Sequence, residues 1–179
     1  DYNIQPGLYW SAMDGHEAGK LGIARTGLTE NHACTGYLTV WSRLQELNPG
    51  MYYDACATGG TRYDLSTMRY SFLHTRSDEW ANIENAQIQA YGSSMWFLYC
   101  GTGFTDLSTY DVRSHISNSI GVGITHETSA PALEGALEEW LDLAAYLMYD
   151  YYPLTGYAGT SDKTMSMQYD SPEDGKGMF

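Results

Sequence analysis

A cysteine and a pair of glycines stand where a strand-like run ends. The run 51–55 is followed at once by Cys56-Ala57-Thr58-Gly59-Gly60. A strand that ends in glycines presents its backbone and small side chains to a ligand, because glycine allows close approach. Asp78 stands just beyond a second strand-like run, 70–73. A carboxyl group beside a glycine turn at strand ends suggests a site that cleaves glycosidic bonds.

Each of these features also has an explanation that involves no ligand. The glycine pair is compatible with an ordinary turn. Asp78 is compatible with a helix N-cap, because Asp is favoured there and a polar, helix-compatible stretch follows it. Taken singly, the two features leave these alternatives open.

Strand-like and helical segments alternate along most of the chain. The patterns predict strands at 51–57, 70–76 and 115–125, and helices at 31–47, 64–69, 80–91 and 132–149. The run 94–100 fits either state, and Gly101 and Gly103 are expected to break it. Residues 1–5 read as the end of a strand, and residues 6–30 read as an irregular functional loop.

This alternation implies an α/β fold with a parallel sheet and outer helices. A complete (β/α)8 TIM barrel needs about 250 residues, so the 179 residues would hold roughly its second half. We therefore expect residues 1–150 to be the C-terminal half of a catalytic barrel. Residues 151–179 would be a linker and the first strands of a C-terminal β-domain, with a hairpin turn at Asp174-Gly175.

The composition excludes several kinds of partner. Lys and Arg number 9 against 22 Asp and Glu, which gives a net charge of −13. A field of this sign repels phosphate backbones, so we expect no nucleic-acid partner. No apolar run approaches the ~20 residues that span a bilayer, so we expect no membrane partner. The 16 Tyr and 5 Trp suit sugar stacking, although tyrosine also fills half-buried strands.

The cysteines and histidines give no sign of a metal site. Cys34, Cys56 and Cys100 form no CxxC pair, and the five histidines show no HxxxH or HxH spacing. We expect no disulfide framework, no bound metal and no cofactor. The sequence starts at Asp1 without a methionine, so we expect a piece of a longer protein, and the cellular location stays open.

Four motifs resemble those of alpha-galactosidases of glycoside hydrolase family 36. The segment 54–60 is similar to the family's (E/D)-N-C-(S/A)-S-G-G signature, and Arg76-Ser77-Asp78 to the segment that carries its general acid/base. Asp1-Tyr2-Asn3 resembles the nucleophile motif. The segment 150–155 resembles the link between barrel and β-domain. The resemblance covers nearly the whole chain, but Ala55, Thr58 and Arg76 depart from the common residues, which puts the substrate in question.

The resemblance implies a retaining glycoside hydrolase, most closely an alpha-galactosidase, that forms a covalent glycosyl-enzyme intermediate. Asp1 would be the nucleophile and Asp78 the general acid/base. The candidates for substrate binding are Asn3, Cys56, Thr58, Gly59, Arg76 and Trp80. Arg76 could equally serve an internal ion pair, and Trp80 would help to exclude water from Asp78. Asp54 would orient the neighbouring loop.

The expected partners follow from the same resemblance. They are an alpha-galactoside or related oligosaccharide, the missing N-terminal half of the same barrel and, for the full-length enzyme, a further copy of itself. The fragment alone would be inactive. Two alternatives stay open: a non-catalytic carbohydrate-recognition domain on a degenerate barrel, which has no reason to keep both Asp1 and Asp78, and a cysteine hydrolase, which would need a histidine near Cys56.

Overall fold

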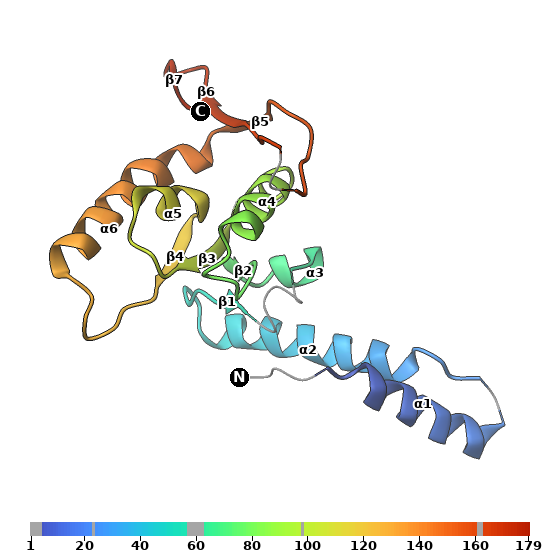
Figure 1. Cartoon of the computed structure of the whole chain (residues 1–179). Helices are drawn as coiled ribbons and strands as arrows, with labels where there is room; N and C mark the ends of the chain where they lie inside the picture. The colour runs from blue at the N-terminus through green and yellow to red at the C-terminus, as the bar shows by residue number, and fades with distance from the viewer. Residues whose placement is uncertain (1–4, 23, 57–62, 98, 161–162) are drawn as a thin grey trace.

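A parallel four-stranded sheet forms the centre of the structure (Figure 1). The computed structural model describes residues 5–22, 24–56, 63–97, 99–160 and 163–179. Its sheet contains the strands β1 Asp54–Ala55, β2 Leu73–Thr75, β3 Cys100–Phe104 and β4 Ser119–Val122. They lie in chain order, and each neighbouring pair is parallel. The predicted parallel sheet in a mixed α/β chain is therefore confirmed.

Each strand of this sheet is followed by a helix, because parallel neighbours need a crossover connection. The helices are α3 Leu65–Met68, α4 Ile83–Ser94, α5 Thr109–Ser114 and α6 Ala130–Ala144. Three of them begin at a side chain that accepts a hydrogen bond from a backbone N–H of the first turn; the capping residues are Asp64, Asn82 and Ser108.

The helices pack on one face of the sheet. Phe104 of β3 is fully buried against Val112 of α5 and Ala136 of α6, and Ile120 and Val122 of β4 pack against the same cluster. Side chains alternate between the two faces of a strand. The register therefore places a second set of residues on the opposite face, which we call the glycine face: Asp54, Leu73, Thr75, Gly101, Gly103, Ser119 and Gly121.

Two helices that precede the sheet form an arm that projects from the body (Figure 1). They are α1 Gly7–Leu21 and α2 Leu28–Leu47. The carboxylate of Asp14 in α1 accepts hydrogen bonds from the backbone N–H groups of Gly27 and Thr29, at 2.5 and 2.9 Å, and from the Thr29 hydroxyl at 2.6 Å. These bonds, the hydroxyl first, lower the pKa of Asp14 and hold the start of α2 against α1.

The predicted loop over residues 6–30 is wrong, because α1 occupies Gly7–Leu21. The glycines that suggested a loop differ in their roles. Gly22, with φ 66°, ends α1, and Gly27, with φ 85°, precedes α2. Only these two of the glycines in the described part of 6–30 need the left-handed backbone conformation that favours glycine.

Other helices and strands also differ from their predicted bounds. Of the run 94–100, which fitted either state, Ser94 is the last residue of α4 and Cys100 is the first residue of β3. Gly101 and Gly103 lie inside β3 instead of breaking a strand before it. The helix α5 was not predicted, and β4 is shorter than the expected 115–125. The expected helix 132–149 is α6 followed by a short 3-10 helix, η1 Ala145–Met148.

An antiparallel sheet follows η1. Its strands are β5 Asp150–Pro153, β6 Met167–Ser171 and β7 Lys176–Met178. The β6–β7 connection contains Gly175, with φ 61°, in the predicted hairpin turn. The sheet packs on the body through Tyr169, which is buried with Ala90, Ile116 and Leu147 and shares a 2.6 Å hydrogen bond with the Ser94 hydroxyl.

In the described residues, no helix combines the length and the apolar character that crossing a membrane requires.

Removing the side chain of Phe104 should destabilise the chain strongly. A Phe104→Ala change leaves a cavity in the cluster with Val112 and Ala136, and such losses cost about 3–5 kcal/mol. Urea unfolding followed by circular dichroism measures the difference. Leu141→Ala, at a side chain that is 61% exposed, is the control and should change stability by no more than about 0.5 kcal/mol. Equal effects of the two changes would contradict the core described here.

Candidate functional site

The carboxyl ends of β1 and β2 place Cys56 and Asp78 at the same edge of the sheet. Ala55 is opposite His74 in the parallel β1–β2 pair. Cys56 follows β1 directly, and Asp78 lies three residues after the end of β2. Both residues are exposed. The thiol of Cys56 and the carboxyl group of Asp78 are therefore exposed to solvent at the ends of two neighbouring strands.

The loop that carries Asp78 is held by local hydrogen bonds. The Ser77 hydroxyl accepts a bond of 3.0 Å from the backbone N–H of Glu79, and Ser77 itself is buried. The Glu79 carboxylate accepts a bond from the side-chain amide of Asn85. The backbone N–H of Trp80 donates to the carbonyl of Asp78 at 3.1 Å. The loop is thus fixed while the Asp78 side chain stays exposed.

Asp78 is not a helix cap. Helix α4 begins at Ile83, and the N-cap is Asn82, whose side chain accepts a hydrogen bond from the backbone N–H of Asn85. The alternative reading of Asp78 as the N-cap is therefore wrong. Trp80, which was predicted to begin the helix, lies in the loop before it.

The indole of Trp80 lies on the glycine face, over β3 and β4. A Cβ atom added to Gly103 would lie 2.6 Å from Cε3 of Trp80 and closer still to Cδ2 and Cε2. A Cβ atom added to Gly121 would lie 2.5 Å from Cη2. Gly103 and Gly121 are partners in the β3–β4 register. Both positions therefore need glycine for Trp80 to occupy this place.

Arg76 points to the helix-covered face of the sheet. Its guanidinium donates to the carbonyl of Ile116 at 3.0 Å and to that of Ala86 at 3.5 Å, and it approaches the sulfur of Cys100 at 3.7 Å. The residue is buried. The geometry favours an internal role over contact with a sugar, and in the described part of the chain the partners are carbonyl groups, not the carboxylate of an ion pair.

Asp54 was predicted only to orient the neighbouring loop, but its position makes it a candidate for the site. It lies on the glycine face beside Thr75, one strand away from the Asp78 loop. Partial withdrawal of its carboxyl group from water raises the pKa of Asp54, although the nearby His74 and a hydrogen bond with Thr75 oppose this shift. The alternation of 53–55, with Tyr53 and Ala55 on the other face, was the signal that could have identified it.

Four of the predicted site residues lie outside the described residues: Asp1, Asn3, Thr58 and Gly59. Their roles stay predictions. Among the described residues, no group of three or more His, Cys, Asp or Glu side chains is arranged to hold a metal ion.

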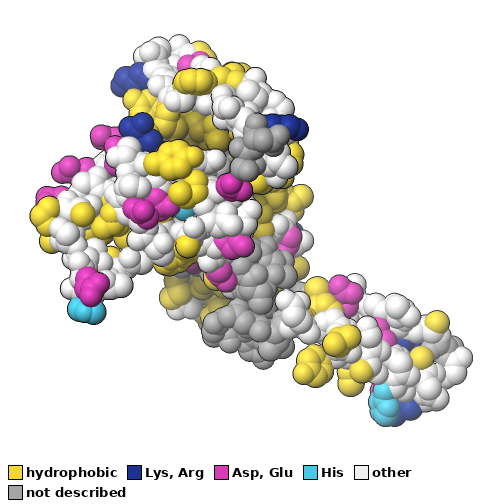
Figure 2. Space-filling model, viewed as in Figure 1, with side chains coloured by type: hydrophobic (Ala, Val, Ile, Leu, Met, Phe, Trp, Pro, Cys, Tyr) yellow, Lys and Arg dark blue, Asp and Glu magenta, His cyan; other side chains and the backbone are white. Residues whose placement is uncertain are grey.

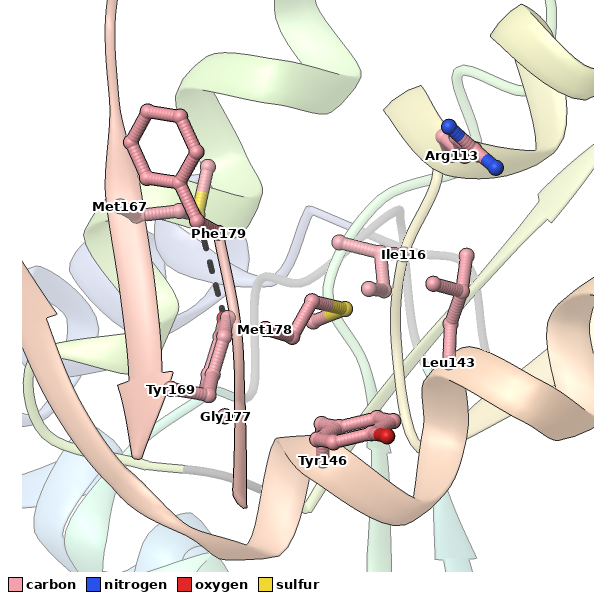
Figure 3. A pocket seen from close by; sticks show the side chains of 9 residues that line it. All are labelled: Arg113, Ile116, Leu143, Tyr146, Met167, Tyr169, Gly177, Met178 and Phe179. Atoms are coloured by element: carbon pink, nitrogen blue, oxygen red, sulfur yellow. Dashed lines mark hydrogen bonds between the residues drawn. The ribbon is translucent and has the colours of Figure 1, made fainter. Parts of the chain in front are cut away.

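A hollow of about 440 Å³ lies away from these strand ends (Figure 3). It is bounded by α5, α6, η1 and the antiparallel sheet, and the residues that line it are Arg113, Ile116, Leu143, Tyr146, Met167, Tyr169, Gly177, Met178 and Phe179. The lining contains no carboxylate or thiol side chain, and Arg113 is paired with Glu139 at 2.5 Å. This hollow therefore has no group that could transfer a proton at neutral pH or attack as a nucleophile.

On the face seen in Figure 2, the acidic side chains do not single out one site. Figure 2 shows acidic side chains spread over the visible face of the body and the arm, with no single concentration. The candidate site is instead defined by geometry, as the strand-end edge with Cys56, Asp78 and Trp80 and the adjoining glycine face with Asp54.

Comparison with known proteins supports a fold assignment. No family model and no curated protein sequence matches this chain. Among solved structures, the crystal structure of the alpha-galactosidase from Lactobacillus brevis is similar, with a TM-score of 0.63 at 16% sequence identity. The match covers 75% of this chain and 20% of the other, so this chain spans about a fifth of that protein's length. At this identity the likeness establishes a shared fold and leaves the activity to be argued from the site.

Replacing Asp54 by Asn should change how stability depends on pH. The folded-state pKa of Asp54 is raised, so its contribution to stability is full below the unfolded pKa of about 3.9 and is lost as pH rises through the folded pKa. The Asp54→Asn chain cannot ionise at this position. It should therefore gain stability relative to the unmodified chain as pH rises from about 3.5 to about 7.

Urea unfolding at a series of pH values measures this difference. Asp142→Asn, at an exposed position of α6, is the matched control for the loss of one negative charge. A relative loss of stability by the Asp54→Asn chain with rising pH, after subtraction of the control, would contradict the raised pKa.

Proposed function

We propose that this chain is part of a retaining glycoside hydrolase that acts on terminal alpha-linked galactosides. The observation that carries the proposal is the exposed Asp78 carboxyl group at the carboxyl end of β2, on a loop fixed through Ser77 and Trp80 and next to the Cys56 strand end. The fold shared with an alpha-galactosidase supports it.

We propose further that residues 1–150 are the second half of a (β/α)8 barrel. Parallel strands in chain order, each followed by a helix on the same face, are the repeating unit of that fold. The glycine face would then line the barrel interior, and the carboxyl ends of the strands would surround the substrate, as in other barrel enzymes. The antiparallel strands β5 to β7 would begin a C-terminal β-domain, and the rest of the protein would supply the other half of the barrel.

The proposed reaction has two steps. In the first, the Asp1 carboxylate attacks the anomeric carbon while Asp78 gives its proton to the glycosidic oxygen, so that the bond to the leaving alcohol breaks and a sugar ester on Asp1 forms. In the second, Asp78 takes a proton from water, which attacks the anomeric carbon and releases the sugar from Asp1. Two inversions give net retention of configuration.

The remaining candidates would shape the sugar site. Cys56 is exposed at the end of β1, where a small side chain allows a sugar to approach the backbone. Asn3 and Thr58 would bind hydroxyl groups and Gly59 would leave room for the ring, on the strength of the sequence motifs alone. Arg76 is not part of the proposed site, because its guanidinium is committed to carbonyl groups on the other face of the sheet.

Replacing Asp78 by Ala in the full-length protein should reduce kcat/KM on an alpha-galactosyl disaccharide by about 10²–10⁴-fold, the usual value of general acid catalysis. The loss should be smaller on an aryl alpha-galactoside, because a good leaving group needs less protonation. Initial rates of galactose and phenol release measure the two effects. Glu84→Gln, at an exposed acid in the first turn of α4, is the control and should leave both rates unchanged.

Replacing Asp1 by Ala in the same protein should abolish turnover of both substrates. Azide should restore turnover and give a glycosyl azide of inverted configuration, which proton NMR identifies. Normal turnover after either replacement would remove that residue from the mechanism. Sugar binding without turnover by the unmodified protein would favour the carbohydrate-recognition alternative instead.

A further inference from the structure

On the glycine face, β3 and β4 carry no large side chains. The interior of a parallel barrel is normally packed with layers of branched residues. Here β3 and β4 place Gly101, Gly103, Ser119 and Gly121 on this face. The space above Gly103 and Gly121 is taken by one side chain that comes from a different segment, the indole of Trp80.

The indole lies flat on the two glycines. A Cβ atom on Gly103 would be within 2.6 Å of three ring atoms of Trp80, among them both atoms of the bond that joins its two rings. A Cβ atom on Gly121 would lie 2.5 and 2.9 Å from Cη2 and Cζ2. Contacts with several ring atoms at once mean that the glycines meet the face of the ring. Trp80 is half-buried among the described residues, and we infer that the side of the ring away from the glycines is the part that these residues leave accessible.

The same loop carries both the indole and the Asp78 carboxyl group. Trp80 donates its backbone N–H to the carbonyl of Asp78. Glu79, which lies between these two residues, is held by hydrogen bonds with Ser77 and Asn85. The position of the aromatic ring relative to the carboxyl group is therefore set by four consecutive residues and by the glycines beneath the ring. This is the arrangement needed to hold a substrate ring at a fixed place beside a proton donor.

We propose that Trp80 is a stacking platform for the apolar face of a pyranose ring, and that Gly103 and Gly121 are the socket that sets its position. The inference rests on the proposed function and adds to it the residue that would position the sugar. In a galactose-type ring, the axial hydroxyl at C4 leaves the C–H groups of C3, C4 and C5 together on one face, and this face suits contact with an indole. The sugar would occupy the accessible face of Trp80 with its anomeric end toward Asp78.

Galactose binding to variants of the full-length protein tests this proposal. Trp80→Leu keeps an apolar side chain but removes the ring, and it should weaken galactose binding about tenfold by calorimetry. Trp80→Phe should retain most of the affinity. Gly103→Ala keeps the indole but blocks its socket, so it should weaken binding as Trp80→Leu does. Gly135→Ala, at a glycine of α6 with no atom within 4 Å of an added Cβ, is the matched control and should bind normally.

Saturation-transfer NMR gives a readout that a purely structural role would not change. Irradiation of the aromatic protons should transfer saturation to H3, H4 and H5 of bound galactose, and the transfer to these protons should fall in Trp80→Leu. Circular dichroism and thermal unfolding show whether each variant is folded. If Trp80→Leu fails to fold, Gly103→Ala still decides the question, through affinity and through transfer to H3, H4 and H5.

The outcomes separate this proposal from the proposed function. If turnover depends on Asp78 but folded Trp80 and Gly103 variants bind galactose with unchanged affinity and unchanged transfer, Trp80 is not the platform and the hydrolase proposal stands. If galactose binds as predicted but the Asp78→Ala protein keeps normal turnover, the platform stands and the catalytic assignment falls. Absence of galactose binding by the unmodified full-length protein would overturn the platform.

Discussion

The hydrogen-bonded ladder from β1 to β4 is the constraint on which the rest of this structure depends. Because all four strands are parallel, their carboxyl ends meet at one edge, and this alone brings Cys56 and Asp78 to the same side of the body although they come from different segments. The register also decides which face each side chain occupies. It sends Arg76 toward α4 and leaves Asp54 and Thr75 on the glycine face.

The two faces of the sheet have different chemistry for this reason. On the helix-covered face, Phe104 packs with Val112 and Ala136 in a buried cluster. The glycine face has small residues on β3 and β4, which do little for stability but leave room for the indole of Trp80. Gly103 and Gly121 have no side chain to pack within the sheet, and the ring of Trp80 leaves no room for one. We therefore explain these two glycines by the space that the ring needs.

Much of the fold could be predicted from the sequence, where local and long-range preferences agree. Helices 31–47 and 132–149 were predicted from apolar residues at helical spacing, and α2 and α6 lie close to those bounds. A short helix was predicted at 64–69, and in the structure the Asp64 carboxylate caps α3 by accepting hydrogen bonds from the backbone N–H groups of Ser66 and Thr67. The parallel sheet followed from the alternation of the elements.

The errors occurred where tertiary contacts override local preference. Gly101 and Gly103 are poor strand residues in isolation, so a break was predicted. Both lie in β3, and the ring of Trp80 leaves no room for a side chain at Gly103. In α1, Gly15 and Gly19 suggested a loop, but Asp14 ties the helix to the start of α2. For the site, the sequence predicted that Asp78 and Cys56 follow strand ends, and the structure places both there. The orientation of Arg76 toward the helices depends on the register of β2, which no local pattern reveals.

The proposed function requires that cleavage of the sugar proceeds through a covalent ester on Asp1. The most direct measurement uses a fluorinated alpha-galactosyl fluoride, which forms the ester quickly and hydrolyses it slowly, on the full-length protein. Mass spectrometry of the digested protein should show one added fluorogalactosyl group, located on Asp1, with excess galactose slowing its formation. A label on any other residue, or an unlabelled protein that still turns over an aryl alpha-galactoside, would contradict the account.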